Sequence, residues 1–530
     1  MYRMKKYILL AFLTLGLTAC ASEPSTSTSG ASEDEGSAEG QGGDLVIDMG
    51  AEAVTLDPHL ANDVPSGNVA SNIYDNLVFF DGEMNIQNNL AKEWEQVDDL
   101  TLRFELEEGV TFHDGEPFNA EAVKANIDRV TDPAIASPRG YLFDNISEVN
   151  VVDEYTVEVK TEEPFAPLIY SFAHNGGGMI SPKAIEEDYA AMEGGSEPGS
   201  VINSHPVGSG YFEFESWDTG QQIKLVNNED YWGEPAKLDS VTFKTVPEDG
   251  TRIADLETGS AHVADPFSPS DVARIEATEG LEIIESDSMG IEYIGFNTQK
   301  EPFDDKRVRQ AISMAVDNDA IINNLLEGYG IPAIGPMSPQ IIGFDETVEP
   351  LEYNPEKAKE LLAEAGYPDG FETSIWTNDK RERIDLVTYL QQELGKIGID
   401  VTTETMEWGA YLEQTNSGDH DMFVLGWSAS TGDADYALSP LFHSMNHGAA
   451  GNKSFLENDE VDQLLEDAQH EMDEDARMAM YKEVQDILID EAPLIYTHHK
   501  QEVNAIRDSV KNLWRHQSGD FRLQEVYIEE

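Results

Sequence analysis

The chain has 530 residues, which is too long for one hydrophobic core, because single cores stop growing at about 250–300 residues. Hydrophobic residues make up 40% and charged residues 26%, a composition that excludes a wholly disordered chain and a polytopic membrane protein. The 103 acidic and 33 basic side chains give a net charge of −70, which repels nucleic acids and anionic lipid surfaces.

The N-terminal segment predicts export. A basic start precedes a short apolar run from Tyr7 to Leu17, which is typical of a secretory signal and too short to span a bilayer. The run closes with small residues before Cys20, a pattern that resembles the lipobox of bacterial lipoproteins, where the cysteine is acylated. Cys20 is the only cysteine, so the chain can form no internal disulfide. We therefore predict a signal peptide over residues 1–19 and lipidation at Cys20.

Residues 20–43 follow as the lipidated cysteine and a tether of Ser, Thr, Gly, Glu and Asp. Such a composition buries too little apolar surface to offset the entropy of ordering, so we expect a flexible acidic segment. Order is expected from Asp44, because Leu45-Val46-Ile47 is typical of a strand that enters a core. No fixed-period repeat follows.

Strands and helices alternate along the remaining chain. Residues 102–106 and 157–159 alternate apolar and charged side chains, which predicts half-buried strands. Asn119 is typical of a helix N-cap, and the helix should run to Val130. Further helices are predicted over 355–365, 386–394 and 461–489. This mixture favours helices packed against sheets.

Motifs for catalysis or metal binding are absent from the sequence. His470-Glu471 begins like the zinc-protease motif, but Glu474 occupies the place of the second histidine. The P-loop, the nucleophile elbow, the dinucleotide-binding glycines and the EF-hand loop are also missing. We therefore predict a protein that is not an enzyme and has no cofactor or metal. A secreted peptidase or glycosidase stays open, because a catalytic carboxylate pair would be hidden among the many acidic residues.

Several motifs in the same order resemble the family 5 extracellular solute-binding proteins, which serve ABC importers of peptides, nickel and glutathione. The likeness runs from Asp44 nearly to the end of the chain. Glu107 stands where the family usually has a cation, which fits the acidity of this chain. The motifs are Leu90-Ala91 with Trp94, residues 106–109, 112–120, 206–211, 231–240, 296–297, 302–311 and 361–370.

Within that family the sequence is most similar to the glutathione-binding members. Residues 426–442, which begin Gly426-Trp427-Ser428, carry this likeness. Dipeptide and oligopeptide binders usually have an aspartate three residues after the tryptophan, where it pairs with the peptide ammonium, but this chain has Ser430. Asp433 is then the nearest candidate for binding an ammonium, with the role of helix N-cap as its alternative.

The resemblance implies an α/β, two-lobed fold of the periplasmic-binding-protein type, of the large three-domain kind with a hinge. Closure of the two lobes would bury a ligand between them. The predicted domains are a first lobe of residues 44–80, 206–286 and 506–530, an inserted domain at 81–205, and a second lobe at 287–505.

The sequence also gives candidate ligand contacts. One of two arginines that follow a predicted strand end could hold a carboxylate, and glycines could let the main chain approach the ligand. Surface arginines, an ordinary turn and core tryptophans are the alternative interpretations. The candidates are Val64, Pro65, Ser66, Asn175, Gly176, Trp376, Arg381, Arg383, Trp427, Ser430 and Asp433.

The implied function is that of a monomeric, lipid-anchored binding protein outside the cytoplasm. It would capture glutathione or a similar short peptide and pass it to an ABC permease in the membrane, with no nucleic-acid partner. A general oligopeptide, dipeptide or nickel-complex binder is the alternative within the family.

The charge predicts salt-dependent stability. Raising the salt concentration from about 0.1 M to about 1 M shortens the Debye length from about 10 Å to about 3 Å and so weakens repulsion among the acidic groups. We expect the melting temperature of the protein to rise by several degrees over this range, as in a salt-adapted protein, in differential scanning calorimetry. A melting temperature that does not respond to salt would instead indicate an ordinary acidic secreted protein.

Overall fold

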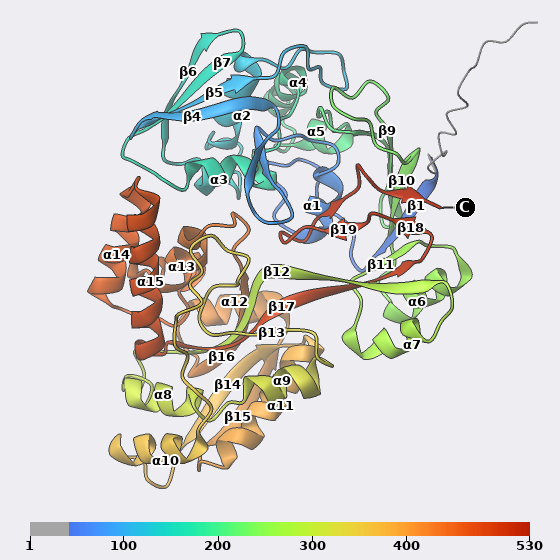
Figure 1. Cartoon of the computed structure of the whole chain (residues 1–530). Helices are drawn as coiled ribbons and strands as arrows, with labels where there is room; N and C mark the ends of the chain where they lie inside the picture. The colour runs from blue at the N-terminus through green and yellow to red at the C-terminus, as the bar shows by residue number, and fades with distance from the viewer. Residues whose placement is uncertain (1–41, 530) are drawn as a thin grey trace, which may run out of the picture. The chain divides into compact units, whose positions relative to one another are not determined.

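Figure 1 shows a computed structural model of the chain, which describes residues 42–529. The predicted signal peptide, the predicted lipidation at Cys20 and the predicted tether up to residue 41 lie outside the described residues. The predicted first strand is present as β1 (Asp44–Met49), and its Leu45 and Ile47 are fully buried.

A mixed sheet of 11 strands extends through the described chain. Its order places β17 and β12 in the middle, where they pair antiparallel, while the strands of either end include parallel neighbours. In order, the strands are β15 (Asp400–Met406), β14 (Glu372–Asn378), β16 (Met422–Ser428), β12 (Leu281–Phe296), β17 (Leu494–Arg507), β11 (Val263–Asp265), β1, β10 (Ser240–Thr245), β9 (Gln222–Asn227) and β8 (Phe212–Asp218), with β13 (Ile331–Pro332) paired to β17.

The long strands β12 and β17 connect the two lobes of the fold (Figure 1). We call residues 42–280 and 508–529 the first lobe and residues 297–493 the second lobe. The pairing of β12 with β17 is regular from Leu281 to Asp287, shifts register between Asp287 and Ile291 and again between Glu292 and Tyr293, and then continues into the second lobe. A register shift in a ladder is a place where strands bend, so an irregular segment from Asp287 to Tyr293 separates the two regular parts of this pairing.

The first lobe contains a second sheet, of four antiparallel strands, and several short helices. The predicted domain boundaries inside this lobe and at residues 286 and 505 stay predictions. Its further elements are α1 (Val64–Ala70), β2 (Val78–Phe80), β3 (Ile86–Asn88), β4 (Ala91–Asp98), β5 (Thr101–Leu106), α2 (Ala120–Val130), β6 (Ile146–Asp153), β7 (Thr156–Thr161), α3 (Leu168–Ala173), α4 (Pro182–Glu193), α5 (Ser200–Ser204), α6 (Asp249–Thr258), α7 (Val272–Glu276), β18 (Val510–Lys511), β19 (Trp514–Arg515), β20 (Phe521–Arg522) and β21 (Tyr527–Ile528).

Helices cover the sheet of the second lobe. Apolar side chains from β12, β14 and β16 pack against α8, α10 and α11 in one buried cluster, as the alternation of apolar residues requires. The helices are α8 (Lys306–Ser313), α9 (Asn318–Leu325), α10 (Pro355–Glu364), α11 (Arg381–Gly395), α12 (Trp408–Asn416), α13 (Ala434–Phe442), α14 (Asp459–His470) and α15 (Glu474–Glu491).

Most of the predicted elements are present with shifted ends. The Asn119 side chain caps α2 as predicted, accepting hydrogen bonds from two backbone N–H groups at 3.0 and 3.1 Å. The helix predicted from Leu386 begins earlier, at Arg381. The amphipathic stretch 461–489 is divided, because Asp473 caps a new helix there.

A buried ion network fixes α2 in the first lobe. The Arg129 guanidinium donates to both carboxylate oxygens of Asp57, at 3.2 and 2.6 Å, and to Asp188 at 3.2 Å. All three side chains are completely buried. Removing one member of such a network leaves unpaired charge in the interior, which is strongly destabilising.

We expect Arg129→Met to lower the free energy of unfolding by about 3–5 kcal/mol, because two carboxylates lose their partner inside the protein. Urea denaturation followed by circular dichroism measures the change. Lys124→Met is the matched control on the same helix, because Lys124 pairs with Asp128 at the surface, where an ion pair contributes less than about 1 kcal/mol. Equal effects of the two substitutions would contradict the structural role of the network.

Candidate functional site

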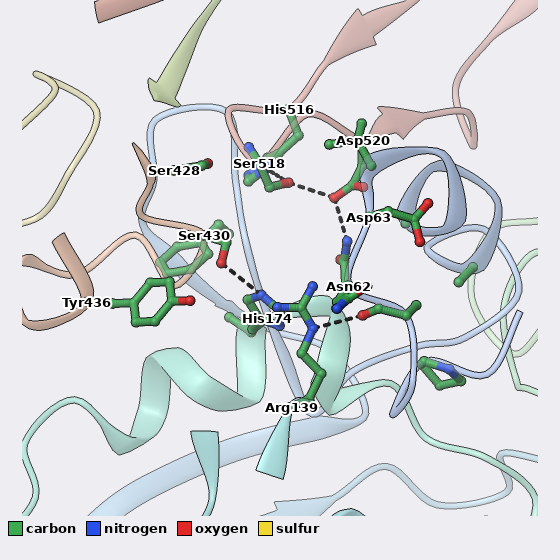
Figure 2. A pocket seen from close by; sticks show the side chains of 18 of the residues that line it. Asn62, Asp63, Arg139, His174, Ser428, Ser430, Tyr436, His516, Ser518 and Asp520 are labelled. Carbon is green, nitrogen blue, oxygen red and sulfur yellow. Dashed lines mark hydrogen bonds between the residues drawn. The ribbon is translucent and has the colours of Figure 1, made fainter. Parts of the chain in front are cut away.

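A cavity of about 260 Å³ lies between the two lobes. The first lobe contributes the loop before α1, the end of β2, the segment after α3 and the C-terminal turn, and the second lobe contributes the end of β16 and the start of α13 (Figure 2). We call it the cleft cavity. Its polar and charged lining residues are Asn62, Asp63, Arg139, His174, Asn175, Ser428, Ser430, Tyr436, His516, Ser518, Asp520 and Arg522.

Two arginines of the cleft cavity have no acidic partner. Arg139 donates from Nε to the Ala61 carbonyl at 2.8 Å, and Arg522 has a buried Nε without a hydrogen-bond partner. Within residues 42–529, every arginine except Arg139, Arg507 and Arg522 forms an ion pair with a carboxylate. Because the chain is so acidic, two unpaired guanidinium groups in one cavity indicate a site for an anionic group of a ligand.

Two carboxylates balance these cations. Asp63 caps α1 and accepts hydrogen bonds from the Ser66 backbone N–H and hydroxyl at 2.9 and 2.8 Å. Asp520 accepts from the Asn175 amide at 2.8 Å and the Ser518 hydroxyl at 2.7 Å (Figure 2). Two cations and two anions make the lining formally neutral, so the cavity suits a small solute that carries charges of both signs.

His174 connects the lobes at the edge of the cavity. Its Nδ1 accepts a hydrogen bond from the Gly176 N–H at 2.8 Å, so Nε2 carries the proton and donates to the Ser430 hydroxyl at 3.1 Å (Figure 2). Burial and the neighbouring Arg139 cation hold the pKa of His174 well below its ordinary value of 6.5. The imidazole is therefore neutral at physiological pH and adds no charge to the cavity.

Aromatic contacts also cross between the lobes. Tyr141 and Tyr436 stack with ring centroids 5.3 Å apart and an interplanar angle of 10°. Trp427 packs on the Tyr436 ring and donates from its indole N–H to the Tyr436 carbonyl at 2.9 Å. The walls on the two sides of the cavity are thus in direct contact in this structure.

Four of the sequence candidates line the cleft cavity, namely Val64, Asn175, Trp427 and Ser430. Ser430 contributes a hydroxyl to the lining. Pro65, Ser66 and Gly176 lie next to lining residues without belonging to the lining themselves. A Cβ added at Gly176 would come within 3.0 Å of the Arg139 side chain, so this glycine gives the arginine room.

The other candidates lie elsewhere. Trp376 is buried against His420, with ring centroids 5.8 Å apart. The Arg381 side chain is 91% exposed. Arg383 is buried and donates from Nε and Nη2 to Glu292, both at 3.1 Å. Neither arginine reaches the cleft cavity, because one lies in solvent and the other is already paired.

Asp433 has a structural role. Its carboxylate is completely buried, caps α13 and accepts a hydrogen bond from Arg477 at 2.8 Å. The capping role, which was the alternative interpretation of this residue, is the one observed. Asp433 therefore does not line the cleft cavity.

The sequence patterns did not reveal the charged residues that do line it. Arg139 follows Ser137-Pro138 in a loop without periodicity, and Asp520 and Arg522 belong to a short C-terminal hairpin. The chain has only 33 basic side chains, and this scarcity is the one feature of the sequence that marks each arginine as a candidate ligand contact. Among residues 42–529, no three His, Cys, Asp or Glu side chains are arranged to hold a metal ion.

Known proteins resemble this chain over most of its length. The family model of the bacterial extracellular solute-binding proteins, family 5, matches residues 85–449. The glutathione-binding protein GsiB of Shigella dysenteriae serotype 1 (strain Sd197) is 38% identical over 482 residues, which cover 89% of this chain and 92% of GsiB.

Solved structures agree with this likeness. HbpA2 from Haemophilus parasuis has a TM-score of 0.82 and 28% identity, covering 92% of this chain and 100% of HbpA2. The ABC transporter-associated periplasmic binding protein DppA from Helicobacter pylori, in complex with the peptide STSA, has a TM-score of 0.79 and 31% identity, covering 93% of this chain and 99% of DppA.

These proteins bind solutes for transporters and are not enzymes. In residues 42–529, no helix is both long and apolar enough to cross a bilayer. The family match covers more than half of the sequence, and the relatives share both its fold and a large part of its residues. The chain belongs to family 5 of the bacterial extracellular solute-binding proteins.

Proposed function

We propose that this protein captures glutathione, or a similar short peptide, between its lobes and delivers it to the permease of an ABC importer. The observation that carries the proposal is the formally neutral cleft cavity with two guanidinium groups, from Arg139 and Arg522, that have no acidic partner. Glutathione has two carboxylates and one ammonium. Its carboxylates match the two arginines, and its ammonium matches Asp63 or Asp520.

Hinge closure gives a mechanism for capture. Moving an open-to-closed ratio from 99:1 to 1:99 needs about 5.5 kcal/mol of differential affinity. A hydrogen bond to a charged group contributes about 1.5–3 kcal/mol, so two or three bonds from the second-lobe hydroxyls of Ser428, Ser430 and Tyr436 to charged groups of the ligand, made only in the closed state, supply it. The irregular pairing of β12 with β17 around Asp287 is the place where we expect the lobes to pivot.

A general oligopeptide or dipeptide binder is the second candidate. The relative from Helicobacter pylori that binds the peptide STSA supports it. Ser430 weakens it, because a hydroxyl that already accepts a hydrogen bond from His174 cannot form an ion pair with a peptide ammonium. The likeness to GsiB favours glutathione.

We further propose that the protein is held at the membrane by acyl chains on Cys20 and acts as a monomer. Two or more acyl chains give stable anchoring where one chain is marginal, and the acidic residues after Cys20 would keep the folded part away from the anionic surface.

The anchor is tested in cells. Cys20→Ala should move the protein from the membrane fraction to the soluble or secreted fraction, because no acyl chain can then be attached. Mass spectrometry of the mature wild-type N-terminus should show an acylated cysteine, and an unmodified Cys20 would contradict the proposal.

The ligand is tested by isothermal titration calorimetry of the purified protein with glutathione, oxidised glutathione and a set of dipeptides. We expect glutathione to bind and Arg139→Met to weaken its binding by roughly tenfold to a hundredfold, because one ligand carboxylate loses a charge-assisted hydrogen bond of about 1.5–3 kcal/mol.

Arg274→Met is the matched control, because Arg274 is a surface arginine paired with Glu257 away from the cavity. It should leave the affinity unchanged. Binding of ordinary dipeptides without any response to glutathione would overturn the assignment and favour the second candidate.

A further inference from the structure

A second cavity, of about 210 Å³, adjoins the cleft cavity within the first lobe. We call it the side chamber. The two cavities share Phe80, Ala173, Asn175 and Arg522 in their linings. The two cavities are therefore adjacent, and two of the four shared side chains are apolar.

Aromatic side chains form much of the side chamber. Beyond the shared wall its lining includes the rings of Tyr74, Phe79, Tyr211, Tyr231 and Trp514 beside six polar or charged residues. Trp514 is 37% exposed, so the chamber ends near the protein surface. Rings of this kind favour apolar and aromatic groups, which gain both burial and ring contacts.

Most polar groups of the side chamber are engaged with the protein, and the exceptions are the Tyr74 hydroxyl and the Arg522 Nε, which have no hydrogen-bond partner. Asp75 accepts hydrogen bonds from the Ser209 hydroxyl, the Tyr231 hydroxyl and the Trp232 indole at 3.0, 3.2 and 2.9 Å. At the outer end, the Gln524 amide donates to the Glu234 carbonyl and Glu525 pairs with Lys237, both at 2.7 Å. Apart from the Tyr74 hydroxyl and Arg522, little polar capacity is left for a ligand.

Arg522 stands at the boundary between the two cavities. Burial, followed by the Arg522 cation, lowers the pKa of His516 in the cleft cavity to about 3. The same cation opposes the rise that burial causes in the pKa of Tyr211 in the side chamber. A ligand carboxylate on Arg522 would therefore place the adjacent part of the ligand against the shared wall.

We propose that the natural ligands include glutathione S-conjugates, with the apolar substituent on sulfur held in the side chamber. This inference rests on the proposed binding of glutathione. The thiol sulfur is the one attachment point that leaves all three charged groups of glutathione intact, and those groups are the ones that the cleft cavity matches. The two arms of oxidised glutathione fit less well, because the second arm would bring charges among aromatic rings.

The test is isothermal titration calorimetry of the full mature protein with glutathione and S-benzylglutathione. We expect S-benzylglutathione to bind about tenfold more tightly, equivalent to about 1.4 kcal/mol, because its ring is buried against the aromatic wall. Equal or weaker binding of S-benzylglutathione beside normal binding of glutathione would overturn this inference and leave the proposed function intact. Absence of glutathione binding would overturn both.

Two variants address the side chamber itself. Ser71→Phe adds a ring at a half-buried position that lines only the chamber, and Trp514→Ala removes part of its wall. Each should abolish the tenfold preference while leaving the affinity for glutathione unchanged. Trp408→Ala, at a similarly exposed tryptophan that lines neither cavity, is the control and should retain the preference. An equal loss of both ligands in Ser71→Phe and Trp514→Ala would contradict a separate chamber.

Discussion

The small number of basic side chains is the constraint on which the binding site of this protein depends. With 103 acidic and 33 basic side chains, a carboxylate is available to almost any arginine, and the structure pairs nearly all of them. Arg139 and Arg522 are exceptions that meet in one cavity. An unpaired guanidinium away from bulk water has a high desolvation cost, so such groups persist where water or a ligand can reach them. The fold keeps acids away from them by engaging Asp63 and Asp520 with neutral donors.

Two contacts that join the lobes at the cavity are neutral. The hydrogen bond from His174 to Ser430 and the stack of Tyr141 on Tyr436 each contribute about 1 kcal/mol. Bonds from the second-lobe hydroxyls of Ser428, Ser430 and Tyr436 to charged groups of a ligand are stronger than either contact. Because the bonds to the solute are stronger than the contacts between the lobes, binding of the solute shifts the equilibrium between the open and closed states, as a receptor for transport requires.

Local patterns predicted much of the fold. Asn119 was recognised as a cap because a short polar side chain satisfies free N–H groups at a helix start, and the alternation in residues 102–106 indicated β5. The site was harder to predict. Ser430 and Trp427 were found through a family resemblance, but Arg139 and Arg522 lie in a loop and a hairpin whose neighbours in space are remote in sequence. The position of Arg383 after a predicted strand end suggests a ligand contact, but in the structure its guanidinium forms an ion pair with Glu292.

The cleft cavity joins the two ends of the described chain. The Phe521 N–H donates to the Asn68 side chain, 453 residues earlier, and Asp520 accepts from Asn175, 345 residues earlier. Contacts of such high sequence separation form slowly, because a large loop must close before they are made. A chain that crosses a membrane starting from its N-terminus could therefore not complete the cleft cavity until the segment with Asp520 and Phe521 has crossed as well. Binding of a solute would then take place only on the outer side of that membrane.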